Sequence, residues 1–169
     1  MKHTEAFTLV ELILYVALLS IITTALISFA WSVIYSRVRT QVDQEIDRNL
    51  RLVSDKLTAE VAKGSTVSAV TASSLTVASP HTSRTPVTFD LASGRVRFGV
   101  GTAGSCPATS PCPLTSNSVT VTNLTFTDLA ATNSANIRYS ITITGSVTSN
   151  RAEYSNSQTL TGTLELKSR

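Results

Sequence analysis

The sequence has few of the residue types from which metal sites and active sites are built. Its 169 residues include two Cys, two His, one Met and one Trp, and only 6% are aromatic. Two Cys and two His are the bare minimum for a structural zinc site, but one is His3, close to the first residue, and the spacings match no zinc-finger pattern. The other, His81, lies in a Ser/Pro stretch with no acidic residue nearby. No phosphate loop, dinucleotide motif or nucleophile elbow is present, so we expect neither an enzyme nor a cofactor.

Charge is also scarce. Charged residues make up 15% of the chain, against about 25% in an average soluble domain, and the net charge is only +3. Basic residues never cluster beyond close pairs such as Arg37 with Arg39, or Arg95 with Arg97. Nucleic-acid binding requires a denser basic stripe, so we expect no nucleic-acid partner. Ser and Thr together contribute 49 residues, and the many β-branched residues argue against a disordered chain.

A long apolar run stands out near the start. No charged residue occurs in the 24 positions from Leu12 to Tyr35, which as a helix would be about 36 Å long, enough for a bilayer core of about 30 Å. Trp31 and Tyr35, followed by two Arg, resemble the aromatic and basic edge of a membrane interface. A secretory signal peptide is the alternative, but its apolar core is shorter, about 7–15 residues. The run therefore predicts one transmembrane helix.

Glu11 interrupts this pattern at its beginning. A carboxylate at the centre of a membrane helix costs about 2.5–3.5 kcal/mol, and less near the end. No Lys or Arg lies three or four positions away to pair with it. Two readings are open: a partner from another chain, or a carboxylate that reaches the headgroups at the interface.

The segment Ala6-Phe7-Thr8-Leu9-Val10-Glu11-Leu12 resembles the processing and methylation motif of type IV prepilins and type II secretion pseudopilins. The family has a short polar and basic leader, a small residue, Phe-Thr-Leu-Val-Glu-Leu and then about twenty apolar residues. The match covers residues 1–35. It implies that prepilin peptidase cleaves between Ala6 and Phe7, that Phe7 is N-methylated, and that Glu11 pairs with the terminal amine of a neighbouring subunit.

Two positions depart from the family pattern. Ala6 replaces the usual Gly before the cleavage site, which leaves the efficiency of cleavage open. The mid-segment Pro of many major pilins is absent around Leu26–Phe29, which favours a minor pilin or pseudopilin. The region after the helix also resembles W/J-type minor pilins in its Ser/Thr-rich sheet and in the segment from Leu114 to Val119.

An amphipathic stretch follows the apolar run. Between residues 36 and 63 the apolar side chains recur every three or four positions, at Val38, Val42, Ile46, Leu50, Val53, Leu57 and Val61. Opposite charges stand four apart at Arg39/Asp43, Asp47/Arg51, Arg51/Asp55 and Lys56/Glu60. Gly64 is a typical helix stop. We therefore expect one helix from Phe7 to Lys63, with the amphipathic half packed on the chain's own β domain.

From residue 64 onward Thr alternates with apolar residues, which is typical of half-buried strands. The expected strands are Thr66–Val70, Ser74–Ala78, Val87–Leu91, Val96–Val100, Ser118–Thr127, Ile137–Val147 and Thr159–Lys167. The segment Ala92-Ser93-Gly94-Arg95 predicts a hairpin turn. We expect one antiparallel sheet packed on the amphipathic half of the helix.

Two linkers are expected, Ser79–Pro86 and Gly101–Pro113. The second contains Cys106 and Cys112 with two prolines between them, a spacing that suits a small disulfide-closed loop outside the cytosol. Because the loop is short, such a bridge would contribute at most about 3 kcal/mol.

Taken together, these features predict an α+β, pilin-like fold with four parts. They are a leader (1–6), the membrane half of the helix (7–35), its amphipathic half (36–63) and a β-rich head (64–169). The resemblance implies a structural subunit of a type IV pilus, a type II secretion pseudopilus or a competence pilus. Its expected partners are prepilin peptidase, other pilin subunits and the inner-membrane assembly machinery, with the precursor held in the cytoplasmic membrane and the head outside the cytosol. A membrane-anchored β domain that binds an extracellular ligand without polymerising is the alternative.

Overall fold

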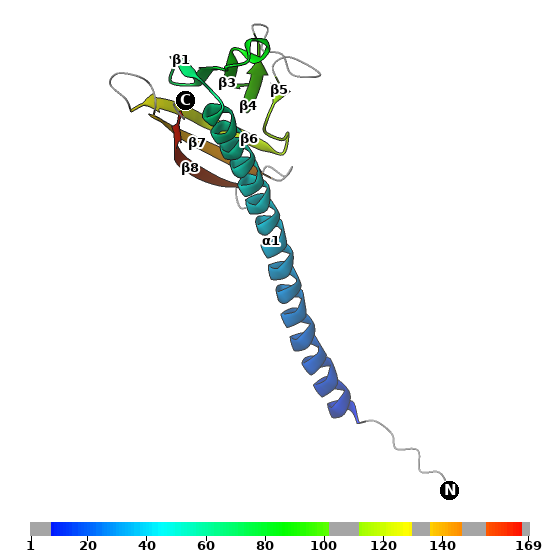
Figure 1. Ribbon diagram of the computed structural model, residues 1–169. Helices are drawn as coiled ribbons and strands as arrows, with labels where there is room; N and C mark the ends of the chain where they lie inside the picture. The colour runs from blue at the N-terminus through cyan, green and yellow to red at the C-terminus, as the bar shows by residue number, and fades with distance from the viewer. Residues whose placement is uncertain (1–7, 102–111, 130–135, 147–154, 167–169) are drawn as a thin grey trace. The chain divides into compact units, whose positions relative to one another are not determined.

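A computed structural model of the chain describes residues 8–101, 112–129, 136–146 and 155–166. The chain divides into two compact units, Met1–Thr40 and Gln41–Arg169. A single α-helix precedes all the strands of the described part (Figure 1). The elements in order are α1 (Leu9–Ala62), β1 (Thr66–Val70), β2 (Ser74–Ala78), η1 (Thr82–Arg84), β3 (Val87–Ala92), β4 (Arg95–Val100), β5 (Cys112–Pro113), β6 (Val119–Asp128), β7 (Asn136–Ser146) and β8 (Ser155–Glu165).

Helix α1 is 54 residues long. Its first turn is capped by Thr8, whose Oγ1 accepts a hydrogen bond from the Glu11 backbone N–H at 3.3 Å; Thr and Glu three positions apart are the usual capping pair. At the other end the Gly64 N–H bonds to the Val61 carbonyl at 2.9 Å. The predicted single helix is confirmed within the described residues. It ends one residue before Lys63, and Phe7 lies outside the described residues.

The strands form two antiparallel sheets, so the prediction of one sheet is wrong. Five strands pair in the order β1-β2-β3-β4-β5, and three pair in the order β6-β7-β8. Strand β6 lies against β2, β3 and β4 without pairing with them. The physical reason is that the inner residues of β6 and β7 are apolar and nearly fully buried. A second layer packed on the first encloses them, whereas one wide sheet on a single helix would leave part of that face exposed.

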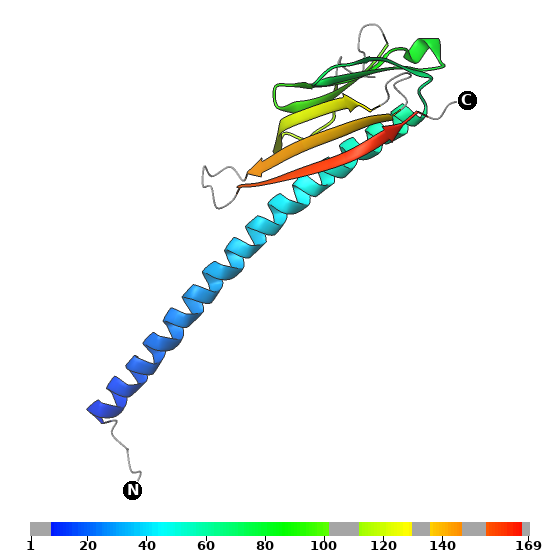
Figure 2. The same ribbon diagram turned by 90° about the vertical axis from the view of Figure 1, so that its left-hand side faces the viewer.

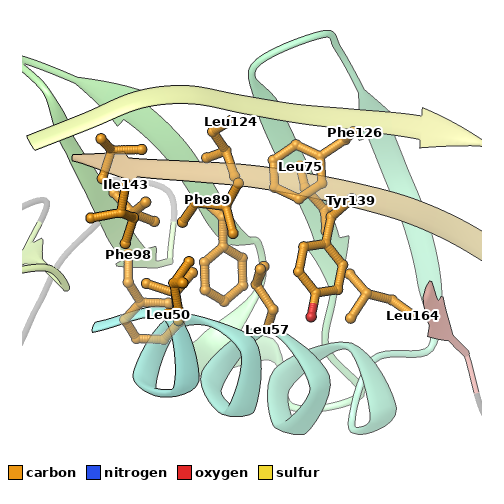
Figure 3. Close-up of a cluster of buried hydrophobic side chains, with 14 of the residues drawn as sticks. Leu50, Leu57, Leu75, Phe89, Phe98, Leu124, Phe126, Tyr139, Ile143 and Leu164 are labelled. Atoms are coloured by element: carbon orange, nitrogen blue, oxygen red, sulfur yellow. The ribbon is translucent and has the colours of Figure 1, made fainter. Parts of the chain in front are cut away.

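The core lies between the two sheets and the C-terminal part of α1. Figure 3 shows Leu50 and Leu57 of α1 packed below Phe89 of β3, with Tyr139 of β7 reaching toward the helix. The Phe89 and Phe98 rings lie 5.2 Å apart between centroids and are tilted by 48°. Val38, the first member of the predicted helix stripe, is half-buried. The other six members are buried: Val42, Ile46, Leu50, Val53, Leu57 and Val61. The prediction that this half of the helix packs on the chain's own β domain is confirmed for those six residues.

The predicted β3–β4 hairpin is confirmed. Ala92 pairs with Arg95, and Ser93 and Gly94 between them have φ of 52° and 69°. Two consecutive residues with positive φ fit a type I′ turn, which matches the twist of the strands. The turn also lies on β6, because the Gly94 carbonyl accepts the Val121 N–H at 2.8 Å.

Strand boundaries agree closely with the sequence pattern in the first sheet and less well elsewhere. β1 and β2 have the predicted ends, but β8 begins at Ser155 instead of Thr159. The linkers are not wholly irregular either. Cys112–Pro113 forms the short strand β5 on β4, and Thr82–Arg84 forms the 3-10 turn η1.

Candidate functional site: the apolar segment and the head

The first 27 residues of α1, Leu9 to Tyr35, present an apolar surface that is almost entirely exposed. The helix is long and apolar enough to cross a membrane, and no part of its most hydrophobic stretch is buried inside the protein. Leu19 and Ile22, for example, are 62% and 55% exposed. A core helix of a soluble domain would bury such residues, so this segment needs another apolar environment. A lipid bilayer provides one.

Four Ser and Thr residues within the apolar segment have hydrogen-bond partners in the helix itself. Thr23 and Thr24 donate to carbonyls one turn earlier at 2.8–3.0 Å, and Ser20 and Ser28 do the same at 2.7 and 3.1 Å. Such back-bonding satisfies a hydroxyl donor without water. The Ser and Thr residues are therefore compatible with a lipid environment.

Two aromatic residues, Trp31 and Tyr35, lie at the C-terminal border of the apolar segment. The rings of Trp31 and Tyr35, one turn apart, lie 6.2 Å apart between centroids and are tilted by 34°. Arg37 and Arg39 follow and are exposed. Aromatic rings beside basic residues favour the boundary between hydrocarbon and headgroups.

Glu11 lies in the first turn of α1. An acidic side chain at this position interacts favourably with the helix macrodipole, typically by about 0.3–1 kcal/mol. Within the described residues no cation forms an ion pair with its carboxylate. Among the predicted processing residues, Ala6 and Phe7 lie outside the described residues, so the structure does not place Glu11 relative to them.

Four groups of polar contacts join the C-terminal part of α1 to the strands and loops of the head. At one end of this part Asp43 accepts a hydrogen bond from Asn156 Nδ2 at 2.6 Å. In the middle, the Ser54 and Tyr139 hydroxyls are 2.7 Å apart.

Asn49 is buried and belongs to a hydrogen-bond network with Ser116, in the loop that follows β5. Its Oδ1 accepts the Ser116 N–H at 2.9 Å, and Ser116 Oγ donates to Glu45 Oε1 at 2.7 Å. The Asn49 side-chain nitrogen donates to the Glu45 carbonyl at 2.8 Å. Sequence reasoning missed this network because Ser116 is distant in sequence and nothing in its local pattern marks a contact.

Glu60 is the most buried acidic side chain of the described part, only 4% exposed. Arg84 of η1 binds both its oxygens at 3.0 and 3.2 Å, and Lys56 contacts it at 3.1 Å. The Lys56 ammonium also lies 4.5 Å from the centre of the Phe98 ring. The spacing of Lys56 and Glu60 predicted their pairing correctly, but the contact with Arg84 has no sequence signal.

On the first sheet, Asp90 of β3 faces Arg97 of β4 in register. Arg97 Nε donates to Asp90 Oδ1 at 2.8 Å. The hydrogen bond to Asp90 raises the pKa of Arg97 above its ordinary value, while partial desolvation opposes the shift. The pair is a cross-strand contact and points to no chemistry.

A metal site in the described part of the head would require several His, Cys, Asp or Glu side chains close together. There, no group of three or more His, Cys, Asp or Glu side chains is arranged to hold a metal ion. His81 is exposed ahead of η1. A groove of about 520 Å³ lies along β1 and the end of β6, lined by Val67–Ala72 and Phe126–Asp128. Its lining combines hydroxyl and apolar residues with one carboxylate, that of Asp128.

The predicted disulfide involves one residue that the structure does not describe. Cys112 is half-buried in β5 beside Phe98 of β4, and Cys106 lies outside the described residues. The Cys106–Cys112 bridge therefore stays a prediction.

Comparison of the chain with family models, with curated proteins and with solved structures finds no match. Function must therefore be argued from the residues and from the geometry described above.

Proposed function

We propose that the chain is a structural subunit of a type IV pilus or a related filament, such as a type II secretion pseudopilus or a competence pilus, in the manner of a minor pilin. In this proposal prepilin peptidase cleaves between Ala6 and Phe7, and Phe7 becomes the N-methylated terminus. The precursor is held in the cytoplasmic membrane with its head outside the cytosol. The mature helix then packs against the helices of other subunits.

One observation carries the proposal: a single helix has two halves with different environments. From Val42 to Val61 its apolar stripe is buried in the head, whereas from Leu9 to Tyr35 its apolar side chains are exposed. A subunit that is stored in a membrane and later packed in a filament needs an apolar segment of this kind, with side chains that are not buried within its own chain. The motif from Ala6 to Leu12 supplies the more specific support.

Glu11 supports the same proposal through its charge. It is an acidic residue in an otherwise apolar segment, and no cation of the described residues pairs with it. If it is ionised among packed helices, a neighbour's Phe7 amine can offset its desolvation cost of several kcal/mol. The competing interpretation is that the first-turn position and the headgroup region already satisfy the carboxylate.

The substitution Glu11→Gln separates these interpretations, because it preserves shape and removes the charge. We expect normal membrane insertion and a normally folded head. The ratio of sheared surface protein to membrane-held protein should fall about ten-fold, since a charge-assisted hydrogen bond contributes about 1.5 kcal/mol.

The matched control is Glu5→Gln, which removes a carboxylate from the segment proposed to be cleaved and leaves the mature protein unchanged. It should assemble like the wild type. Recovery of Glu11→Gln in sheared filaments at the wild-type ratio would show that the carboxylate has no pairing role.

The alternative function, a membrane-anchored ligand-binding domain, is favoured only by the groove beside β1. It predicts the same transmembrane segment but a different mature N-terminus. Intact mass of the protein from native membranes distinguishes the two, because a pilin-like subunit begins at Phe7. A mass that retains Met1–Ala6 on surface-associated protein would exclude the pilin-like proposal.

A further inference from the structure

The two sheets have four edges within the described residues, and three of these edges are poorly suited to pairing with another chain. β1 has five residues and a register shift between Val67 and Ala69. β5 has two residues and contains Pro113. β6 also has a register shift, and two of its open N–H groups already bond to carbonyls of the first sheet and its loops. Short strands, bulges, proline and coverage are the usual means by which proteins prevent edge-to-edge pairing.

β8, the fourth edge, is the longest and most regular of the four within the described residues. It runs for 11 residues from Ser155 to Glu165 and pairs with β7 without any register shift. It contains no proline and no lysine, and Glu165 at its end is its single charged residue. Figure 2 shows it as the outer strand of the three-stranded sheet, beside the C-terminal part of α1.

The direction of the β8 amides follows from one contact. The Ser157 N–H donates to the side-chain oxygen of Asn156 at 2.8 Å, so it does not point to β7. Alternate residues of a paired strand direct their amides to the same side. The N–H groups of Thr159, Thr161 and Thr163 are therefore on the open edge with that of Ser157.

The side chains of β8 determine which side chains an additional strand, paired with its open edge, would contact. On the face toward α1, Leu160 is half-buried and Leu164 is buried, and Gly162 lies directly beneath the Tyr139 ring. A Cβ at Gly162 would come within 2.6 Å of that ring. On the opposite face the odd-numbered residues are exposed Ser and Thr, followed by exposed Glu165 at the end of the strand. An added strand thus fits best if it alternates apolar residues toward α1 with polar residues outward.

We propose that the open edge of β8 binds an extended segment of a different polypeptide, a strand of alternating apolar and polar residues, by antiparallel or parallel strand addition. The inference rests on the proposed function, because that function supplies neighbouring subunits in the same assembly. Main-chain hydrogen bonds along the edge provide the affinity, and the half-buried Leu160 favours an apolar side chain beside it.

A second copy of the chain is a less suitable occupant for a geometric reason. Two β8 strands paired antiparallel are related by a two-fold axis normal to the sheet. Residues 42–61 of α1 pack on the face of this sheet, so the axis would reverse their direction in one copy. The two chains would then enter their heads at residue 42 from opposite directions, which does not suit two heads attached to one membrane surface.

Hydrogen–deuterium exchange of the full-length protein, resolved by residue within β8, tests the proposal. We compare the protein in native membranes and in the sheared fraction with the same protein purified alone in detergent. The amides of Thr159, Thr161 and Thr163 should exchange at least about ten-fold more slowly in the native samples, whereas the Ser157 N–H already bonds to Asn156 and is not used. Equal rates in native and purified samples would overturn the proposal.

A pair of variants tests the role of the edge directly. Thr161→Pro removes one open-edge N–H without removing a bond to β7, because proline is tolerated where the amide faces outward. We expect it to abolish the slow exchange at Thr159 and Thr163, while Thr161→Val keeps it. Protection of the β7-facing amides of Leu160 and Gly162 shows that β8 itself remains folded.

The remaining outcomes are also decisive. Slow exchange in the purified protein that increases with concentration and accompanies a dimeric mass would assign the edge to a second copy and contradict the proposal. Fast β8 exchange in protein recovered from sheared filaments would overturn the inference and leave the filament function intact. Slow β8 exchange in protein that never leaves the membrane would support strand addition and contradict the filament function.

Discussion

Glu60 illustrates at the scale of single residues how a buried charge is held. Its side chain is 4% exposed, whereas its partners Lys56 and Arg84 are 35% and 43% exposed. If Glu60 is removed, water can still hydrate the cations of Lys56 and Arg84. If a cation is removed, water cannot reach the buried carboxylate of Glu60 to the same extent. This asymmetry predicts that loss of a cation is more harmful than loss of the carboxylate.

We expect Arg84→Met to lower the free energy of unfolding by about 3 kcal/mol, because it leaves a buried carboxylate with one cation fewer. Glu60→Gln should cost less, about 1–2 kcal/mol, since the amide retains hydrogen bonding and the released cations face solvent. Urea unfolding followed by far-UV circular dichroism measures both. A larger cost for Glu60→Gln than for Arg84→Met would contradict the asymmetry.

The two cysteines give a second prediction at this scale. If the head is outside the cytosol, Cys106 and Cys112 should form a bridge and resist alkylation until they are reduced. Reduction should destabilise the head by about 2–3 kcal/mol, because the closed loop is short. Prompt labelling of both thiols in native protein would show that the bridge is absent.

At the scale of elements, the C-terminal part of α1 packs against the strands of the head with only one of its faces. Leu57 is fully buried, whereas Leu52, five residues earlier on the same helix, is 48% exposed. We expect Leu57→Ala to cost about 2–5 kcal/mol of unfolding free energy. Leu52→Ala, the matched control, should stay within about 0.5 kcal/mol. Thermal unfolding of both variants in the same detergent provides the comparison, and similar losses would show that the helix is not seated as described.

Some elements were predictable because their signals are local. β1 and β2 alternate in hydropathy and are bounded by Ser, Thr and Gly, and their predicted ends match the structure. The turn at Ser93 and Gly94 depends on neighbouring residues alone. β8 was predicted to start too late because Ser155–Gln158 lacks an apolar residue, and its pairing with β7 determines its true beginning.

Other features depend on contacts distant in sequence and had no local signal. The division into two sheets, the bond between Arg84 and Glu60, and the network of Asn49 with Ser116 all join segments separated by 24 or more positions. Strand β5 was assigned to a linker because Cys112-Pro113 has the composition of a loop. In the candidate site, Glu11 and the apolar run were visible in the sequence, whereas the open edge of β8 required knowledge of the pairing order.

At the scale of the whole molecule, the apolar segment and the head belong to separate compact units. Thirteen of the 24 residues from Leu12 to Tyr35 are Leu, Ile, Val or Phe. At about −0.3 to −0.6 kcal/mol each, they favour membrane insertion by about 4–8 kcal/mol. One arginine at the helix centre costs about 2.5–3.5 kcal/mol, which is less than this total, and two cost about as much as it.

We therefore expect Ile22→Arg to remain in the membrane and the double variant Ile22→Arg/Leu26→Arg to lose most of its insertion. The fraction of protein that resists alkaline carbonate extraction measures this. Ile22→Ala/Leu26→Ala is the control for lost side-chain volume and should remain inserted. Because the head is a separate unit, its thermal unfolding should be the same in all three variants. If the doubly charged variant resisted extraction as well as the alanine control, the apolar segment would not be embedded in lipid, and the membrane part of the proposed function would be wrong.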